Sequence, residues 1–181
     1  MIGSTIAKRY ARAFFEIADE EKQLENYYRE INGFSSIVEG NEDLKEFLAN
    51  PIFDQAEKKS VVENILEKTD ISGITANFLK LLADKQRIVI LKDIVESYRE
   101  MMDEALKTVR VSVKTAFPLS AELVQHLQEG LERQTGKNVD MTVVEDQSLL
   151  GGIVVRVGDT LYDNSIKTQL NNIRNLLGEE V

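Results

Sequence analysis

The sequence predicts an α plus α+β protein, with an N-terminal six-helix bundle over residues 1–105 and a small C-terminal domain containing a β-α-β unit over residues 106–181. Two observations lead to this prediction. Apolar residues recur at spacings of three and four through the first part of the chain, which is the period of amphipathic helices. Near Thr108 the period changes to two, which is typical of a strand with one buried face. A length of 181 residues is enough to bury such a core.

The first three helices are predicted from apolar stripes separated by short breakers. One face of the first helix carries Ile6, Tyr10, Ala13, Phe14 and Ile17, and one face of the second carries Leu24, Tyr27, Tyr28, Ile31, Phe34 and Val38. The second helix is expected to stop near Gly40-Asn41. A short third helix holds Leu44, Phe47 and Leu48. It ends at Asn50-Pro51, because the residue before a proline disfavours helical backbone.

The next three helices follow from one cap and further stripes. Asp54 is predicted to cap the fourth helix, with Glu57 three residues later completing a capping box. The inward residues are Val61, Val62, Ile65 and Leu66 in the fourth helix; Ile74, Phe78, Leu81 and Leu82 in the fifth; and Ile88, Leu91, Ile94, Val95, Tyr98, Met101 and Ala105 in the sixth.

The second domain is predicted as a β-α-β unit followed by further strands and a final helix. Val109, Val111 and Val113 alternate with polar residues, and Val139, Met141 and Val143 do so after an intervening helix. Ser120 is expected to start that helix and Gly136 to close it. A strand over residues 153–157, a Gly158-Asp159 turn and a short Leu161-Tyr162 strand follow. The final helix carries Ile166, Leu170, Ile173 and Leu177.

The composition excludes several classes of function. The chain has 22 Lys and Arg against 31 Asp and Glu, a net charge of -9, which disfavours binding to nucleic acid or to an acidic membrane surface. No apolar run approaches the ~18 residues of a membrane span, so direct insertion into a membrane is not expected. With no Cys and one His, the chain lacks thiolate zinc sites and thiol catalysis. The first residues lack a signal-peptide pattern, and we expect a mature, cytosolic protein.

No pattern in the sequence indicates an enzyme, a metal site or a cofactor. The carboxylates of the second domain lack the spacing of a calcium-binding loop, and Ser and Lys show no nucleophile–base spacing. Gly151-Gly152 precedes a strand, not a helix, so it lacks the arrangement that holds phosphates, and we expect close backbone packing or a bulge there. The sequence therefore predicts a protein that acts through interactions.

Four stretches carry a family resemblance. They are Ala7–Ala18, with Arg-Tyr-Ala-Arg-Ala at its centre, Asn77–Ile88, Ala116–Ser120 and Ser148–Asp159, the last followed by Asp163 and Ser165. In this order and at this length, the chain resembles the family of the delta subunits of bacterial F-type ATP synthases, homologous to the mitochondrial oligomycin-sensitivity-conferring protein. One departure is Gln147-Ser148, where many relatives place a Pro close to the turn.

The resemblance implies a non-catalytic stator subunit. Such a subunit clamps the catalytic α/β head to the b subunits of the peripheral stalk, so that proton-driven rotation is coupled to ATP synthesis. The helical domain would bind the head and the C-terminal domain the stalk. The acidic composition favours the bacterial subunit, on the cytoplasmic side of the plasma membrane. The alternative is a cytosolic helical adaptor that binds an amphipathic peptide in an unrelated complex.

The resemblance also implies a groove between helices 1 and 5 for the N-terminal helix of an α subunit. Both helices have apolar residues around more of their circumference than one core face requires, although a central helix buried on all sides has the same pattern. The candidate contacts are Tyr10, Ala11, Ala13, Phe14, Asn77, Phe78, Lys80, Leu81 and Arg87. Lys8, Arg9, Arg12, Lys80 and Arg87 form either a basic rim or a merely solvated face. The C-terminal family motif contributes Gly151, Gly152, Gly158, Asp159 and Asp163.

Overall fold

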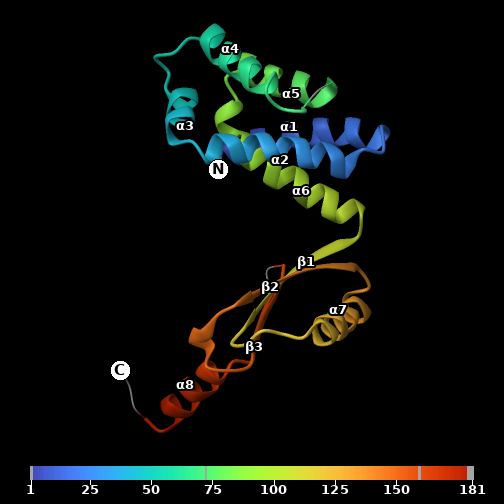
Figure 1. Ribbon diagram of the computed structural model, residues 1–181, viewed down its shortest axis with the longest axis vertical. Helices are drawn as coiled ribbons and strands as arrows, with labels where there is room; N and C mark the ends of the chain where they lie inside the picture. The colour runs from blue at the N-terminus through green and yellow to red at the C-terminus, as the bar shows by residue number, and fades with distance from the viewer. Residues whose placement is uncertain (1, 72, 159, 179–181) are drawn as a thin grey trace. The chain divides into compact units, whose positions relative to one another are not determined.

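The computed structural model of the chain describes residues 2–71, 73–158 and 160–178. The chain divides into two compact units, Met1–Met102 and Asp103–Val181. Over the described residues the first unit is helical and the second contains a four-stranded sheet with helices, so the predicted fold class is confirmed (Figure 1). That residues 1–105 and 106–181 fold independently and have separate roles stays a prediction. Among the helices of these residues, none is long and apolar enough to cross a membrane.

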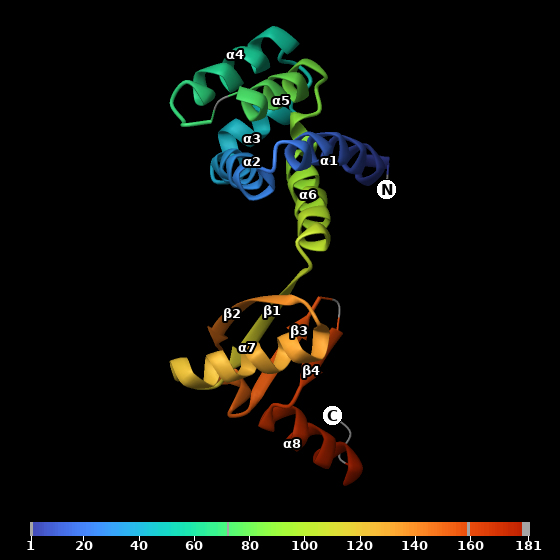
Figure 2. The same cartoon turned by 90° about the vertical axis from the view of Figure 1, so that its right-hand side faces the viewer.

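The first unit contains the six predicted helices. They are α1 (Ile2–Glu20), α2 (Leu24–Glu39), α3 (Glu42–Ala49), α4 (Gln55–Leu66), α5 (Gly73–Asp84) and α6 (Leu91–Ala105), which is preceded by a 3-10 turn, η1 (Ile88–Ile90). Helices α4 and α5 lie side by side in both views of the chain (Figures 1 and 2). Because residues 88–90 form the 3-10 turn η1, α6 starts three residues later than its apolar stripe suggested.

The helix caps show where local chemistry sets the boundaries. The capping box at α4 is confirmed: Asp54 Oδ1 accepts from the Glu57 N–H at 2.7 Å, and Glu57 Oε2 accepts from the Asp54 N–H at 3.0 Å. Gly40 has φ -78°, so it is not the left-handed cap that a glycine at a helix end suggests. The next residue, Asn41, is the N-cap of α3, and its side chain accepts from the Leu44 N–H at 3.1 Å.

The core of the first unit is built around Phe14 of α1. Its ring is fully buried and stacks on Phe78 of α5 with the ring centroids 4.3 Å apart. It also contacts Tyr27 of α2 and Tyr98 of α6, at 5.6 and 5.5 Å between centroids. The Tyr98 hydroxyl donates to the Leu24 carbonyl at 3.0 Å, which satisfies the polar end of a buried ring. One aromatic side chain therefore joins four helices.

The second unit is a mixed sheet with the order β2-β1-β3-β4. Its elements are β1 (Thr108–Thr115), α7 (Ala121–Thr135), β2 (Asn138–Glu145), a 3-10 turn η2 (Gln147–Leu149), β3 (Ile153–Val157), β4 (Thr160–Asp163) and α8 (Ile166–Leu176). Strands β1 and β2 are parallel and joined through α7, so the predicted β-α-β unit is confirmed. Strand β3 pairs antiparallel with β1 and with β4. Ser120 caps α7, and Gly136, at φ 67°, ends it as expected.

The two faces of this sheet differ because side chains alternate along each strand. Helix α7 covers one face (Figure 2), where its Leu127 and Leu131 pack on a core formed by Val111, Val113, Val139 and Val155. The opposite face presents Ser112, Lys114, Val154, Arg156 and Leu161, which line a pocket. We call it the open face of the sheet.

Candidate functional site

Helix α1 carries two adjacent apolar stripes. Ala7, Ala11, Phe14 and Ala18 are fully buried and form the stripe that faces the core. Ile6, Tyr10, Ala13 and Ile17 follow each other at four-, three- and four-residue spacing beside it. Of these, Ala13 is exposed and Ile17 is 40% exposed, although Ile17 was expected to face the core. Helix α1 therefore has more apolar surface than the bundle uses.

Helix α5 shows the same division. Thr75, Leu79 and Leu82 are fully buried, and Phe78 is 9% exposed. Asn77 and Leu81 point away from this core, and Leu81 is 44% exposed although it was expected to face inward. Lys80 and Ile74 are half-buried, and Arg87 is exposed beyond the end of the helix.

The predicted contact residues thus fall into two groups. Ala11 and Phe14 are fully buried and Phe78 nearly so, which means that their side chains offer no free surface to a partner. For these residues the alternative of a helix face buried in the bundle is correct. Tyr10, Ala13, Asn77, Lys80, Leu81 and Arg87 remain at least partly accessible.

Accessible residues occur on both helices and adjoin, in sequence, the ring pair that joins them. Phe14 and Phe78 stack where α1 meets α5, and Ala13 and Asn77 directly precede them in sequence. We call Tyr10, Ala13 and Ile17 of α1 together with Ile74 and Leu81 of α5 the α1/α5 surface. Its basic neighbours Lys8, Arg9 and Arg12 are exposed. Exposure of these residues fits a basic rim and a merely solvated face equally, so the basic rim stays a prediction.

Helix α8 carries an exposed apolar stripe. Ile166, Leu170, Ile173 and Leu177 are 44%, 52%, 53% and 77% exposed. Their spacing of four, three and four places them on one face of the helix. We call these residues the α8 stripe. They are the apolar residues from which the helix was predicted, but the second unit does not bury their side chains.

The paired glycines of the family motif hold the start of α8 against the sheet. A Cβ atom on Gly151 would lie 2.5 Å from Cδ1 of Ile166, and one on Gly152 would collide with the carbonyl oxygen of Asn164. Gly152 also has φ +78°, a conformation that favours glycine. The Gly151 carbonyl accepts from the Ile166 N–H at 3.0 Å. The close backbone packing expected at this pair is confirmed, and its function is to seat α8.

Asp163 has a structural role at the same place. Its Oδ1 accepts from the Ser165 N–H at 2.9 Å, and its Oδ2 accepts from the Thr168 hydroxyl at 2.8 Å. These hydrogen bonds lower the pKa of the Asp163 carboxyl. Gly158, at φ +56°, begins the turn between β3 and β4, whereas Asp159 lies outside the described residues. The family motif therefore shapes a turn and caps a helix.

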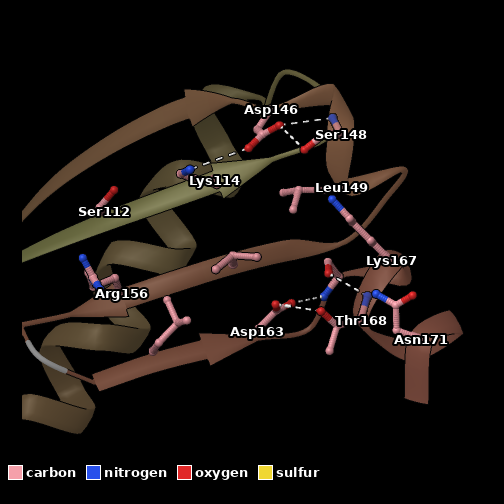
Figure 3. A pocket seen from close by; sticks show the side chains of 13 residues that line it. Ser112, Lys114, Asp146, Ser148, Leu149, Arg156, Asp163, Lys167, Thr168 and Asn171 are labelled. Atoms are coloured by element: carbon pink, nitrogen blue, oxygen red, sulfur yellow. Dashed lines mark hydrogen bonds and ion pairs between the residues drawn. The ribbon is translucent and has the colours of Figure 1, made fainter. Parts of the chain in front are cut away.

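A pocket of about 480 Å³ lies between the open face of the sheet and α8 (Figure 3). It is lined by Ser112, Lys114, Asp146, Ser148, Leu149, Val154, Arg156, Leu161, Asp163, Ser165, Lys167, Thr168 and Asn171. No pattern in the sequence had indicated it, because its residues come from separate elements. Within the described part of the chain, no cluster of three His, Cys, Asp or Glu residues is placed to hold a metal ion.

Comparisons with known proteins agree with this architecture. The chain is 65% identical over 181 residues to the ATP synthase subunit delta of Syntrophus aciditrophicus, with both chains covered completely. It is 41% identical over 172 residues to the same subunit of Desulfatibacillum aliphaticivorans, covering 95% of this chain and 94% of that one. A chain in the cryo-EM structure of the Toxoplasma gondii mitochondrial ATP synthase hexamer shares the fold. That match has a TM-score of 0.65 and 21% identity, and it covers 97% of this chain and 98% of the other.

The family model described as "ATP synthase delta (OSCP) subunit" matches residues 6–177. This range begins at Ile6 in α1 and ends at Leu177, the last residue of the α8 stripe, so it extends over most of both units. With nearly the whole sequence matched and a relative at 65% identity, this chain belongs to the ATP synthase delta (OSCP) subunit family.

Proposed function

We propose that this chain, a non-catalytic subunit of the peripheral stalk of an ATP synthase, clamps the catalytic head to the stalk through two separate apolar surfaces. The α1/α5 surface binds the N-terminal helix of an α subunit, and the α8 stripe binds the b subunits. The clamp keeps the α/β head from turning with the rotor, so that proton-driven rotation is coupled to ATP synthesis. It works on the cytoplasmic side of the bacterial plasma membrane.

The observation that carries this proposal is that each unit has an apolar helix stripe that the unit leaves partly or largely uncovered. A helix that packs only against its own domain needs a single buried stripe, whereas α1 has a second one that leaves Ile17 40% exposed. In α8 all four stripe residues are more than 40% exposed. Stripes with anchors three and four residues apart are the surfaces that bind partner helices.

The chemistry of the α1/α5 surface fits an amphipathic helix. Ala13 is small, so a partner backbone can approach closely, while Tyr10 and Leu81 offer larger accessible apolar side chains. Phe14 and Phe78, on the same two helices, are buried among four helices, so they hold α1 and α5 together without touching the partner. A rigid surface loses little conformational entropy on binding, which favours slow dissociation.

The alternative of an adaptor in an unrelated complex is not favoured, because the family match extends from residue 6 to residue 177. An adaptor of that kind would bind an amphipathic peptide but would capture no ATP synthase subunit. Co-purification from native membranes distinguishes the two functions. We expect α, β and b subunits to be retained with the chain.

A truncation tests the division of roles between the units. Removing all residues after Lys107 deletes the sheet, α7 and α8 but leaves the whole helical bundle. The truncated protein should bind the purified α/β head and lose the b subunits. Circular dichroism shows whether the bundle has stayed helical. If the folded truncated protein still captured b subunits, the stalk contact would have to lie in the first unit.

A further inference from the structure

We propose that the pocket on the open face of the sheet receives acidic side chains of the stalk segment that covers the α8 stripe. The inference depends on the stalk contact proposed above and adds the chemistry by which the partner is recognised. The partner segment is then an amphipathic helix whose apolar stripe is accompanied by Asp or Glu residues on the side toward the pocket.

The pocket has the size and mixed lining of a recognition site. Its volume is about 480 Å³, and Leu149 and Val154 contribute buried apolar surface to it. Hydroxyl groups line it at Ser112, Ser148, Ser165 and Thr168. Three basic side chains reach it from three different elements, namely Lys114 of β1, Arg156 of β3 and Lys167 of α8.

The two carboxylates of the pocket already have partners inside the unit. Asp146 lies 3.6 Å from the Lys114 ammonium group and accepts from the Ser148 hydroxyl at 2.6 Å. Asp163 accepts from Ser165 and Thr168 at the start of α8. The hydrogen bonds from Ser148 lower the pKa of Asp146. Neither carboxylate pairs with Arg156 or Lys167.

Arg156 and Lys167 therefore remain as cations without an ion pair among the described residues. They stand at opposite ends of the pocket in Figure 3, with Lys167 extending from α8 toward Leu149. A small inorganic anion would contact one of them, whereas a peptide segment carrying two acidic side chains reaches both. The chain as a whole has a net charge of -9, so two cations without an ion pair in one concave site form a local positive charge that selects an acidic partner group.

Continuity with the α8 stripe identifies which segment enters the pocket. On α8, Ile166 and Leu170 belong to the stripe, while Thr168 and Asn171 line the pocket and Lys167 lies between the two sets. The helix Ile166–Leu176 contains Lys167 and Arg174 but no acidic residue. A partner helix on the stripe therefore has basic neighbours and places acidic side chains of its flank toward the pocket.

Zero-length cross-linking tests the proposed contact directly. A carbodiimide joins a lysine amine to a carboxylate with loss of one water, so it reports only groups in contact. With the full chain bound to the soluble segment of the b subunits, we expect a bond between Lys167 and an Asp or Glu of that segment, identified by mass spectrometry. If the bonds to the b segment formed only at lysines outside the pocket, the proposal would be overturned.

A binding titration measures what the two cations contribute. The double variant Arg156→Gln and Lys167→Gln should bind the b segment about tenfold more weakly at low salt, with a smaller loss of affinity as salt rises. Lys137→Gln is the matched control, because Lys137 is exposed in the same unit but lies between α7 and β2. An unchanged affinity and salt dependence in the double variant would refute the role of the pocket.

Further outcomes separate this inference from the stalk assignment itself. If the parent chain failed to bind the b segment, the proposed stalk function would be wrong. A different result is that the parent binds the b segment, Leu170→Asp abolishes this binding, and the double variant binds like the parent. In that case the stalk assignment would hold and the acidic contact would be wrong. Binding of the parent to vesicles of phosphatidylcholine and phosphatidylglycerol, lost in the double variant, would instead assign the cations to a lipid surface and overturn the proposal.

Discussion

Aspartate substitutions at two nearby positions of α1 should damage different properties, folding at Ala11 and partner binding at Ala13, because the two residues face different surroundings. Ala11 is fully buried between helices, whereas Ala13 is exposed on the α1/α5 surface. The introduced residue and the helix are the same in both variants, so differences in helix propensity largely cancel. Comparing the two therefore isolates the environment of the side chain.

The magnitudes follow from these environments. At position 11 a carboxylate has no water and no partner, so Ala11→Asp should lower the free energy of unfolding by at least about 4 kcal/mol. At position 13 the folded chain should lose less than about 1 kcal/mol, mostly from the lower helix propensity of Asp. In the complex, however, the same carboxylate is desolvated by the partner helix. We expect Ala13→Asp to weaken binding by about 2 kcal/mol or more, roughly 30-fold.

Two measurements check this prediction. Urea denaturation followed by circular dichroism gives the change in stability of each variant. Titration of a synthetic peptide with the sequence of the α subunit's N-terminal helix gives the affinity of the folded Ala13→Asp chain. If Ala13→Asp were folded and bound the peptide like the parent, the α1/α5 surface would not be the head contact. If Ala11→Asp were as stable as the parent, the placement of Ala11 in the core would be wrong.

Three further predictions concern the domain boundary and the second unit. Limited proteolysis should leave a resistant helical fragment ending near residue 105, and uniform digestion would contradict two independent domains. Gly152→Ala should cost more stability than Gly158→Ala, by at least about 1 kcal/mol in denaturant titrations, because both have positive φ but only Gly152 has a carbonyl oxygen where the Cβ would go. The pKa of Asp163 is lowered from its usual 3.8, so its stabilisation of α8 is present above that pH and is lost as pH falls through the lowered pKa. Amide exchange in α8 should accelerate over that acid range in the parent and less in Asp163→Asn.

Local chemistry explains which parts of the fold the sequence predicts well. The capping box at Asp54, the cap at Ser120 and the left-handed Gly136 each depend on a few consecutive residues, and all three occur as expected. The change of period near Thr108 likewise marks the start of β1. Gly40 shows the limit of this reasoning, since a glycine at a helix end permits a left-handed cap but does not require one.

The family could also be recognised from the sequence, because ordered motifs carry it without any knowledge of packing. Gly151 and Gly152 were expected to allow close packing, but their partners, Ile166 and Asn164, became known only in the folded chain. The pocket was not predicted at all. Arg156 and Lys167 are eleven residues apart, in a strand and a helix, and only the pairing of β3 with β4 and the seating of α8 bring both to one cavity.

The sequence by itself determined the type and order of the elements, since periodicity and caps depend on neighbouring residues. It did not determine which apolar side chains are buried and which stay exposed. Ala11 and Ala13 are the same residue type on one helix, yet Ala11 is buried and Ala13 is exposed. Phe14 and Ile17 are both apolar, and the periodicity placed both in the core, but Ile17 is 40% exposed. The width of a buried face depends on how many helices pack around it. That number is set by contacts between α1, α2, α5 and α6, which are distant in sequence, and so only the tertiary structure decides it.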